Sequence, residues 1–141
     1  MSDVLVLDAS VVIKWFVAEE YTPDALRLLK TPVEYVAPDL LIAEVANTMW
    51  KKVRRGQLTA DRAQRVADAL PAIDLLTIPC RELAGEAHEL AVATSRSVYD
   101  SMYLALALRL DTKLLSADMK FINAIKSIPI LAPHISFIAD S

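Results

Sequence analysis

Four carboxylates of this 141-residue chain occupy positions that a merely solvated acidic residue would not take. Asp8 and Asp118 each follow a short apolar run, Glu44 lies inside one, and Asp100 opens one. Burying a carboxylate without a partner costs several kcal/mol, and two ionised carboxylates about 5 Å apart repel by roughly 3 kcal/mol at an effective dielectric near 20. If the fold brings the four together, a bound divalent cation is the natural compensation, and the chain would be a metal-dependent enzyme.

Each carboxylate taken alone also has a structural explanation, and these alternatives stay open at this point. Asp8 and Asp118 follow predicted strands, where an aspartate commonly caps a helix or stabilises a turn. Asp100 stands three residues after Ser97, as in a capping box. Glu44 is the hardest to explain this way, since apolar residues surround it in a predicted helix, although one buried salt bridge would suffice. The metal site is therefore predicted from the set of four.

The types of residue available narrow the chemistry. Oxygen-only ligands suit hard cations such as Mg²⁺ or Mn²⁺. His88 and His134 lie far in sequence from the acidic positions, which disfavours a zinc site and a Ser-His-Asp or Cys-His hydrolase. Neither glycine, Gly56 nor Gly85, belongs to a phosphate-binding loop. Hydrolysis of a phosphodiester by a metal-activated water is the reaction that such a set serves best.

A basic run, residues 51–55, follows Glu44 on the same predicted helix. Cations are favourable at a helix C-terminus, so this run has a purely structural explanation. It would also suit the phosphates of a nucleic acid strand, and we take Lys51, Arg54 and the more distant Lys14 as candidate substrate-binding residues. Weaker candidates for backbone contacts, expected to be exposed, are Arg96, Arg109, Lys120 and Lys126.

Composition indicates a single compact domain spanning residues 1–141. Hydrophobic residues make up 55% of the chain and charged residues 23%, which supplies a core and disfavours disorder. The net charge of −3 argues only mildly against a nucleic-acid partner. We expect no signal peptide and no membrane span, because no apolar run approaches about 20 residues. The single cysteine, Cys80, fits a reducing cytoplasm.

Strand and helix patterns alternate along the chain. Strands are predicted at 4–8, 33–37, 75–78 and 113–116, with a weak last strand at 128–130; helices are predicted from residue 10 onward and at 22–30, 39–55, 59–70, 81–94, 97–110 and 119–126. Ser10, Thr22 and Thr59 are expected to cap helices, and Gly56 to end one in a left-handed conformation. Alternating elements predict an α/β fold whose parallel sheet is covered on both faces, with a site beyond the carboxyl ends of its strands.

Four segments together resemble a known family. They are residues 7–16 (LDASVVIKWF), 38–47 (PDLLIAEVAN), 99–107 (YDSMYLALA) and 114–118 (LLSAD). Their order and spacing are similar to those of PIN-domain ribonucleases, in particular the VapC-type toxins of toxin–antitoxin systems. The resemblance covers almost the whole chain and is weakest after Ile130.

The resemblance implies a three-layer α/β/α fold with a parallel sheet of four to five strands. It implies a catalytic and metal-binding set for Mg²⁺ or Mn²⁺ made of Asp8, Glu44, Asp100 and Asp118, supported by the hydroxyls of Ser10 and Ser116. The implied activity is endonucleolytic cleavage of RNA that leaves 3′-hydroxyl and 5′-phosphate ends.

The resemblance also implies partners. Toxins of this type form homodimers and are neutralised by a cognate antitoxin, whose binding groove would involve the helices at 22–30 and 59–70. An alternative is a non-catalytic PIN-like module that binds a basic protein partner or RNA. A phospho-acceptor receiver domain also places aspartates at strand ends, but residues 8–10 lack the adjacent acidic residues that it requires.

Overall fold

A parallel sheet forms the centre of the computed structural model, which describes residues 4–140. Within these residues, five strands pair in the order β3-β2-β1-β4-β5. All four pairings are parallel. The strands are β1 (Val4–Leu7), β2 (Glu34–Pro38), β3 (Leu76–Ile78), β4 (Leu114–Ser116) and β5 (Ile135–Phe137). The α-helices are α1 (Ala9–Phe16), α2 (Thr22–Leu28), α3 (Leu40–Arg54), α4 (Ala60–Ala69), α5 (Cys80–Thr94), α6 (Val98–Arg109) and α7 (Met119–Lys126).

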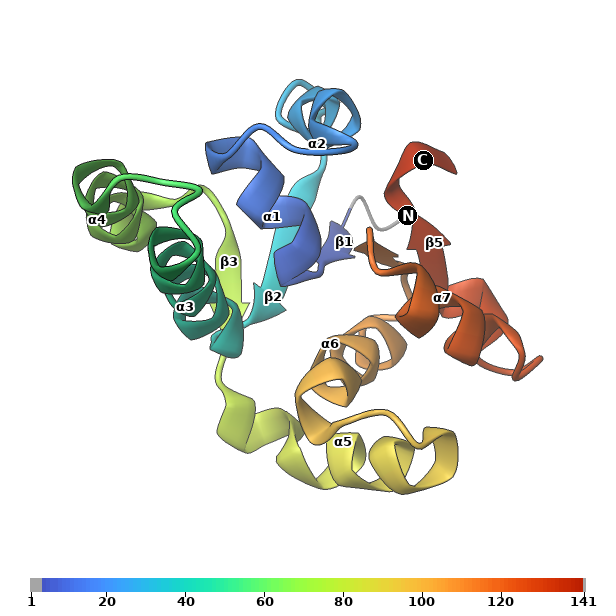
Figure 1. Ribbon diagram of the computed structural model, residues 1–141. Coiled ribbons are helices and arrows are strands. Elements are labelled where there is room, and N and C mark those ends of the chain that lie inside the picture. The colour runs from blue at the N-terminus through green and yellow to red at the C-terminus, as the bar shows by residue number, and fades with distance from the viewer. Residues whose placement is uncertain (1–3, 141) are drawn as a thin grey trace.

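Helices cover the sheet on both sides. Figure 1 shows α1 and α2 on one face of the sheet and α5 and α6 on the other. β1 lies in the middle and pairs with β2 on one side and β4 on the other. The predicted three-layer α/β/α fold is therefore confirmed, and strand order reverses next to β1, where parallel sheets place their binding sites.

Helix α6 contributes more buried residues than any other helix of the described fold. Its residues 101–107 are all buried, as expected from a segment that is apolar nearly all round. It packs along α5 and contacts β1, β2 and β4. Full burial of large side chains such as Tyr103, Leu104 and Leu106 stabilises the fold by roughly 1.5–3 kcal/mol each. A helix fixed this firmly holds its first turn, which carries Asp100, at a defined place.

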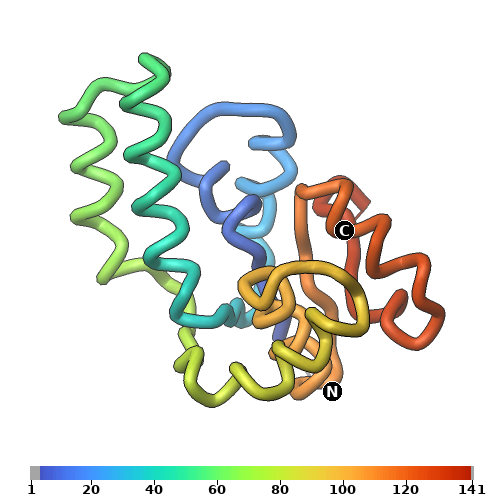
Figure 2. Tube along the Cα trace, turned by 60° about the horizontal axis from the view of Figure 1, so that its bottom comes forward, coloured from blue at the N-terminus to red at the C-terminus, as the bar shows by residue number. Residues whose placement is uncertain are grey.

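The helices α3 and α4 form a hairpin that extends beyond the sheet while α3 packs against α1 and β2. Figure 2 shows the two helices side by side, joined at the end that is farthest from the sheet. Gly56 makes the connection at φ 72°, the left-handed conformation that was predicted. Thr59 caps α4 by accepting a hydrogen bond from the Arg62 amide at 3.3 Å, also as predicted. The hairpin carries the basic run away from the sheet.

Two of the predicted caps are wrong. Tyr21, in a left-handed conformation at φ 67°, takes the N-cap position of α2, and the Thr22 hydroxyl instead accepts from the Glu19 amide at 2.9 Å. Ser10 lies inside the first turn of α1, and its hydroxyl contacts groups from other segments. The Thr22 hydroxyl bonds to the turn just before α2, whereas the Ser10 hydroxyl bonds to Asp8 and to the distant Ala117 amide, which the local sequence could not reveal.

The predicted last strand at 128–130 is wrong as well. This segment forms turns, in which the Leu131 amide donates to the Ile128 carbonyl at 2.9 Å, and Ile130 is 79% exposed. Pro129 has no amide hydrogen for a strand ladder. The fifth strand is instead β5, which pairs with β4. Along residues 4–140, no helix combines the length and apolar composition that crossing a membrane requires.

Candidate active site

The four carboxylates come from four different elements at the carboxyl edge of the sheet. Asp8 follows β1, Asp118 follows β4 by two residues, Glu44 lies in the second turn of α3, and Asp100 lies in the first turn of α6. Asp8 is within electrostatic range of Glu44 and Asp100, and Glu44 is within range of Asp100. Asp118 joins Asp100 through a shared arginine. We call these four residues the acidic cluster.

Asp8 is the buried centre of the acidic cluster. Its exposed fraction is 8%, and two hydroxyls donate to its Oδ2 atom, from Ser10 at 2.6 Å and from Ser116 at 2.8 Å. Burial raises the pKa of the carboxyl from 3.8 to about 6; the two hydrogen bonds oppose this rise, whereas repulsion from Glu44 and Asp100 adds to it. Both hydroxyls use the same oxygen, so neither of them occupies Oδ1.

Ser10 and Ser116 also tie the neighbouring segments together. Ser10 Oγ accepts from the Ala117 amide at 3.0 Å, and Ser116 Oγ accepts from the Asp118 amide at 3.0 Å. Each hydroxyl therefore accepts a backbone hydrogen bond and donates to Asp8. This arrangement fixes both the orientation of Asp8 and the backbone that leads into Asp118.

Glu44 is partly buried and contacts a residue that the sequence alone did not single out. The hydroxyl of Tyr103, on α6, donates a short hydrogen bond to Glu44 Oε1. Burial raises the pKa of the Glu44 carboxyl, and the Tyr103 hydrogen bond partly offsets this rise. Burial, together with the nearby Asp8 and Glu44 carboxylates, raises the pKa of the Tyr103 hydroxyl well above its ordinary value, so Tyr103 serves as a neutral donor. The available signal was spacing, because Tyr103 follows Asp100 by one helical turn.

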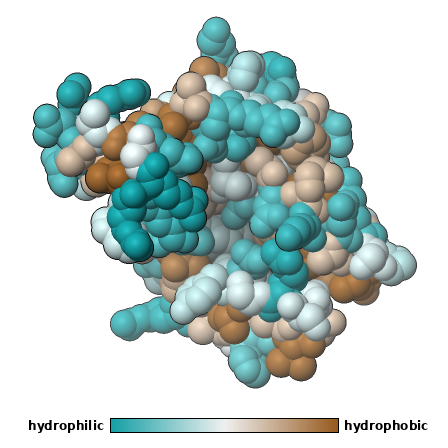
Figure 3. Space-filling view, viewed as in Figure 1, coloured by the Kyte–Doolittle hydropathy of each residue, from teal (hydrophilic) through white to brown (hydrophobic). Residues whose placement is uncertain are grey.

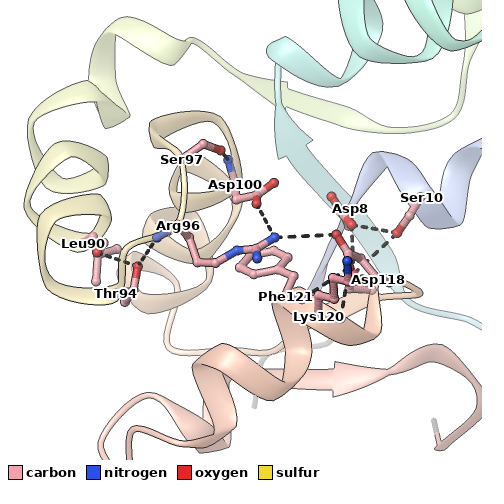
Figure 4. Close-up of polar contacts among 11 residues, drawn as sticks. Asp8, Ser10, Leu90, Thr94, Arg96, Ser97, Asp100, Asp118, Lys120 and Phe121 are labelled. Atoms are coloured by element: carbon pink, nitrogen blue, oxygen red, sulfur yellow. Dashed lines mark hydrogen bonds and ion pairs between the residues drawn. The ribbon is translucent and has the colours of Figure 1, made fainter.

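Arg96 lies between the two remaining carboxylates, as Figure 4 shows. Its Nη2 atom donates to Asp100 Oδ2 at 2.8 Å and lies 3.7 Å from Asp118 Oδ2. Its Cζ atom lies 5.3 Å from the centroid of the Phe121 ring. The expectation of an exposed Arg96 is wrong: 25% of its side chain is exposed, because it crosses from the α5–α6 turn towards α7.

Asp118 has the capping role considered from the sequence, whereas Asp100 takes part in the cap of α6 only through its backbone amide and bonds to Arg96 with its carboxylate. Ser97 accepts from the Asp100 amide at 3.0 Å at the start of α6. Asp118 Oδ1 accepts from the amides of Lys120 and Phe121 at 3.1 and 3.3 Å, which caps α7. The other oxygen of Asp118, Oδ2, is the one that faces Arg96. Capping and membership of the acidic cluster are therefore compatible, because each role uses different atoms.

The donor chemistry of this edge fits a hard divalent cation. Within residues 4–140, neither Asp8 nor Glu44 forms an ion pair, although burial and mutual repulsion raise the pKa of both carboxyls. Oxygen ligands of this kind suit Mg²⁺ or Mn²⁺. In the same described region, no three acidic, histidine or cysteine side chains stand close enough together to hold a metal ion as they are placed. The residue types at this edge thus fit such an ion, although their side chains are not gathered around a single point.

The candidate substrate-binding residues are placed differently from one another. Lys14 is buried, and its ammonium group donates to Glu19 Oε1 at 2.9 Å, while Lys52 donates to the other oxygen of Glu19 at 3.1 Å. Lys51 and Arg54 are exposed on the α3–α4 hairpin. Lys51 follows Glu44 by seven residues, which is nearly two full turns, and so lies on the same face about 10 Å along the axis.

Comparison with known proteins identifies the class to which this fold and site belong. The model of the PIN domain family matches residues 5–126. The chain is 36% identical over 116 residues to ribonuclease VapC3 of Pyrobaculum aerophilum, a match that covers 81% of this chain and 88% of the relative. It is 30% identical over 123 residues to ribonuclease VapC1 of Mycobacterium tuberculosis, covering 86% and 91%.

Solved structures show the same fold. VapC20 of Mycobacterium tuberculosis, described as a sarcin–ricin loop cleaving toxin, superposes with a TM-score of 0.67 at 18% identity, covering 85% of this chain and 94% of the other. A toxin–antitoxin complex from Klebsiella pneumoniae gives 0.65 at 18% identity, covering 95% and 97%. On the family and sequence matches, the chain belongs to the VapC ribonucleases of the PIN-domain family.

Proposed function

We propose that this protein is a metal-dependent endoribonuclease and the toxin component of a toxin–antitoxin pair. The observation that carries the proposal is the acidic cluster, in which a buried Asp8 is held by two serine hydroxyls and repelled by two further carboxylates. Asp8, Glu44 and Asp100 would hold a Mg²⁺ or Mn²⁺ ion, with Asp118 completing the set. When bound, such an ion supplies charge stabilisation for a phosphodiester and lowers the pKa of an attacking water.

The residues of the chain would do the rest of the work. The hydroxyls of Ser10 and Ser116 orient the Asp8 carboxylate, and the Tyr103 hydroxyl orients Glu44. Water attack at phosphorus with departure of the 3′-oxygen would leave the 3′-hydroxyl and 5′-phosphate ends. The familial ribonuclease assignment supports RNA as substrate, and a single reduced cysteine suits action in the cytoplasm.

The exposed basic end of α3 would carry the RNA strand towards the acidic cluster. Figure 3 shows hydrophilic side chains gathered over α3 and a hollow beside it near the middle of the same face. Trp50 is 53% exposed there, and the guanidinium of Arg54 lies 4.9 Å from its ring centroid. Phosphates would contact Lys51 and Arg54, and a base would stack on Trp50. Lys14 is left out of this path because its ammonium is buried against Glu19.

A groove of about 880 Å³ would receive the antitoxin. It lies between the end of α2 and the segment that follows α4, and its lining includes Leu28, Leu29, Ala69 and Ala72. Leu29 and the lining residue Leu76 are both more than half exposed, which favours an apolar protein segment as occupant. The toxin–antitoxin neighbour from Klebsiella pneumoniae supports such a partner, and a homodimer remains part of the proposal. Co-purification with a small protein encoded beside this gene tests the assignment.

The catalytic proposal is tested with Asp8→Asn and Asp100→Asn. Each change removes a metal ligand but keeps the shape of the side chain, so we expect RNA cleavage to fall by at least about a hundredfold with the fold retained. The measurement is cleavage of a labelled single-stranded RNA with Mg²⁺, with Mn²⁺ and with excess EDTA. Asp61→Asn, which changes an exposed carboxylate on α4, is the matched control and should cleave at the wild-type rate.

Full activity in either variant, or in EDTA, would contradict the metal assignment. The competing function is a non-catalytic module, and one observation favours it: Arg96 already neutralises part of the acidic cluster. Calorimetric titration with Mn²⁺ separates the two functions, because a module without metal binding would give no heat that depends on Asp8.

A further inference from the structure

The acidic cluster is electrostatically divided into two halves. On one side, Asp8 and Glu44 have no ion pair among the described residues. The charges of Glu44 and Asp100 repel the Asp8 carboxylate, and the charge of Asp100 repels the Glu44 carboxylate. On the other side, Asp100 and Asp118 share the guanidinium of Arg96. Among the described residues, the ion pairs of the acidic cluster are therefore confined to Asp100 and Asp118, while Lys51 acts on Glu44 only at longer range.

The chain holds Arg96 in place by several independent contacts. Ser95, the residue before Arg96, adopts the left-handed conformation at φ 63°. The Arg96 amide donates to Thr94 Oγ1 at 3.2 Å. Its guanidinium packs over the Phe121 ring, and its Nε atom is buried without a hydrogen-bond acceptor in the described structure. An arginine stays charged at every accessible pH. Moving Arg96 away from both carboxylates would therefore leave a half-buried charge without a partner, which is energetically costly. Arg96 is a fixed cation.

Arg96 places its positive charge between Asp100 and Asp118. Enzymes that hydrolyse phosphodiesters with two ions hold them about 3.5–4 Å apart and bridge them with carboxylates. Here the Nη2 atom of Arg96 is 2.8 Å from Asp100 and 3.7 Å from Asp118, which are the carboxylates that would bridge and complete such a pair. A divalent ion placed between these two carboxylates would meet the guanidinium at contact distance and be strongly repelled.

We propose that Arg96 takes the place of a second divalent ion, so that the chain binds one divalent ion, on the Asp8 side of the acidic cluster, and not two. This inference rests on the proposed metal-dependent function and deepens it. Arg96 acts as a positioning residue: it neutralises Asp100 and Asp118 and fixes the direction of their oxygens, while the single ion is left to Asp8, Glu44 and the free side of Asp100.

Metal stoichiometry tests the proposal in the full chain. Wild-type protein freed of metal with a chelator is titrated with MnCl₂ by calorimetry, and we expect one Mn²⁺ per chain. Arg96→Gln removes the charge and keeps hydrogen-bonding capacity, so we expect two Mn²⁺ per chain and a spin-coupled pair in the electron paramagnetic resonance spectrum. Arg96→Lys restores a cation and should return the value to one. None of these measurements depends on ribonuclease activity.

Three controls separate this role from a structural one. Arg27→Gln removes an exposed arginine–aspartate pair of the same 2.8 Å length on α2 and should leave the stoichiometry at one. Adding Asp118→Asn to Arg96→Gln should remove the second Mn²⁺. Circular dichroism reports whether each variant folds, and the wild-type stoichiometry remains decisive if Arg96→Gln does not.

The contrary outcomes differ from one another. Two Mn²⁺ per wild-type chain, or one in a folded Arg96→Gln variant, would overturn the inference and leave the metal-dependent function intact. Binding in Arg96→Gln but not in wild type would mean that the guanidinium excludes the metal, which also overturns it. No Mn²⁺ binding in either protein would overturn the proposed metal-dependent function together with the inference.

Discussion

Burial raises the pKa of two carboxylates of the acidic cluster, Asp8 and Glu44. Loss of hydration on burial disfavours the charged form of both carboxyls and raises their pKa, and hydrogen bonds from hydroxyl groups lower the pKa again in part. The donors differ: two serines serve Asp8, whereas one tyrosine from the buried helix α6 serves Glu44. Tyr103 is therefore the residue through which the hydrophobic core sets the orientation of Glu44.

Tyr103→Phe tests this link. The change removes the hydroxyl and leaves the ring packed, so the ionised Glu44 loses its donor while partly buried. We expect the free energy of unfolding at pH 7.5 to fall by about 1–3 kcal/mol and the pKa of Glu44 to rise further. Urea unfolding and a carbon-13 NMR titration of Glu44 measure the two effects. Tyr99→Phe, at a tyrosine of the same helix that is 62% exposed, should change neither; an unchanged Glu44 pKa in Tyr103→Phe would contradict the link.

The same residues mark what could be predicted from sequence. Carboxylates at strand ends and in apolar helices were recognisable because an unpaired charge there is costly. The partners Tyr103 and Arg96 were not, because a tyrosine on an apolar helix is explained by burial alone and an arginine in a turn by exposure. Only the fold brings Arg96 from before α6 to Asp118 after β4.

At the scale of elements, helix ends meet at the acidic cluster. α6 and α7 both begin there, so their free amides and positive dipole ends face the carboxylates of Asp100 and Asp118. α3 begins near the same edge and carries its basic C-terminal turns outward. Helices with strong local signals were placed correctly from sequence, whereas the strand β5 was not, because the apolar residues on either side of Pro129 offered a competing candidate a few residues earlier.

Lys51→Glu combined with Arg54→Glu tests the proposed RNA path along α3. Reversing two phosphate-contacting charges should weaken binding of a single-stranded RNA by at least about tenfold at low salt, and reduce the slope of log affinity against log salt by roughly 1.4. Fluorescence anisotropy with catalytically inactive Asp8→Asn protein measures both. The matched control is Arg62→Glu combined with Arg65→Glu, an equal charge reversal on exposed positions of α4. Equal losses in the two double variants would mean that net charge, not this path, governs binding.

At the scale of the whole molecule, the acidic cluster makes stability depend on pH. The Asp8 carboxyl has a pKa of about 6 in the folded chain against 3.8 for an ordinary aspartate, so the folded state binds this proton more tightly than the unfolded state does. The stabilisation from proton binding is fully present below pH 3.8 and is lost as pH rises through about 6. The pKa of Glu44 shifts in the same direction. The pKa of Glu19 shifts in the opposite direction, because hydrogen bonds and charge from Lys14 and Lys52 outweigh the effect of its burial.

Chelator-treated protein should therefore gain stability as the pH falls from 7.5 to 5, and Asp8→Asn isolates the part that belongs to Asp8. The full effect of this residue is about 3 kcal/mol at most, since each pKa unit corresponds to roughly 1.4 kcal/mol. In urea unfolding, Asp8→Asn should be more stable than wild type at pH 7.5 and should lose about half of the difference at pH 5, whereas Asp61→Asn should follow wild type at both. Mg²⁺ should stabilise wild type at pH 7.5, because an ion that binds only the folded state offsets the charge of the ionised Asp8 carboxylate. It should not stabilise Asp8→Asn, which lacks this ligand. A wild type that is less stable than Asp8→Asn by the same amount at both pH values would show that Asp8 keeps its charge across this range, and that burial at the sheet edge does not control its protonation.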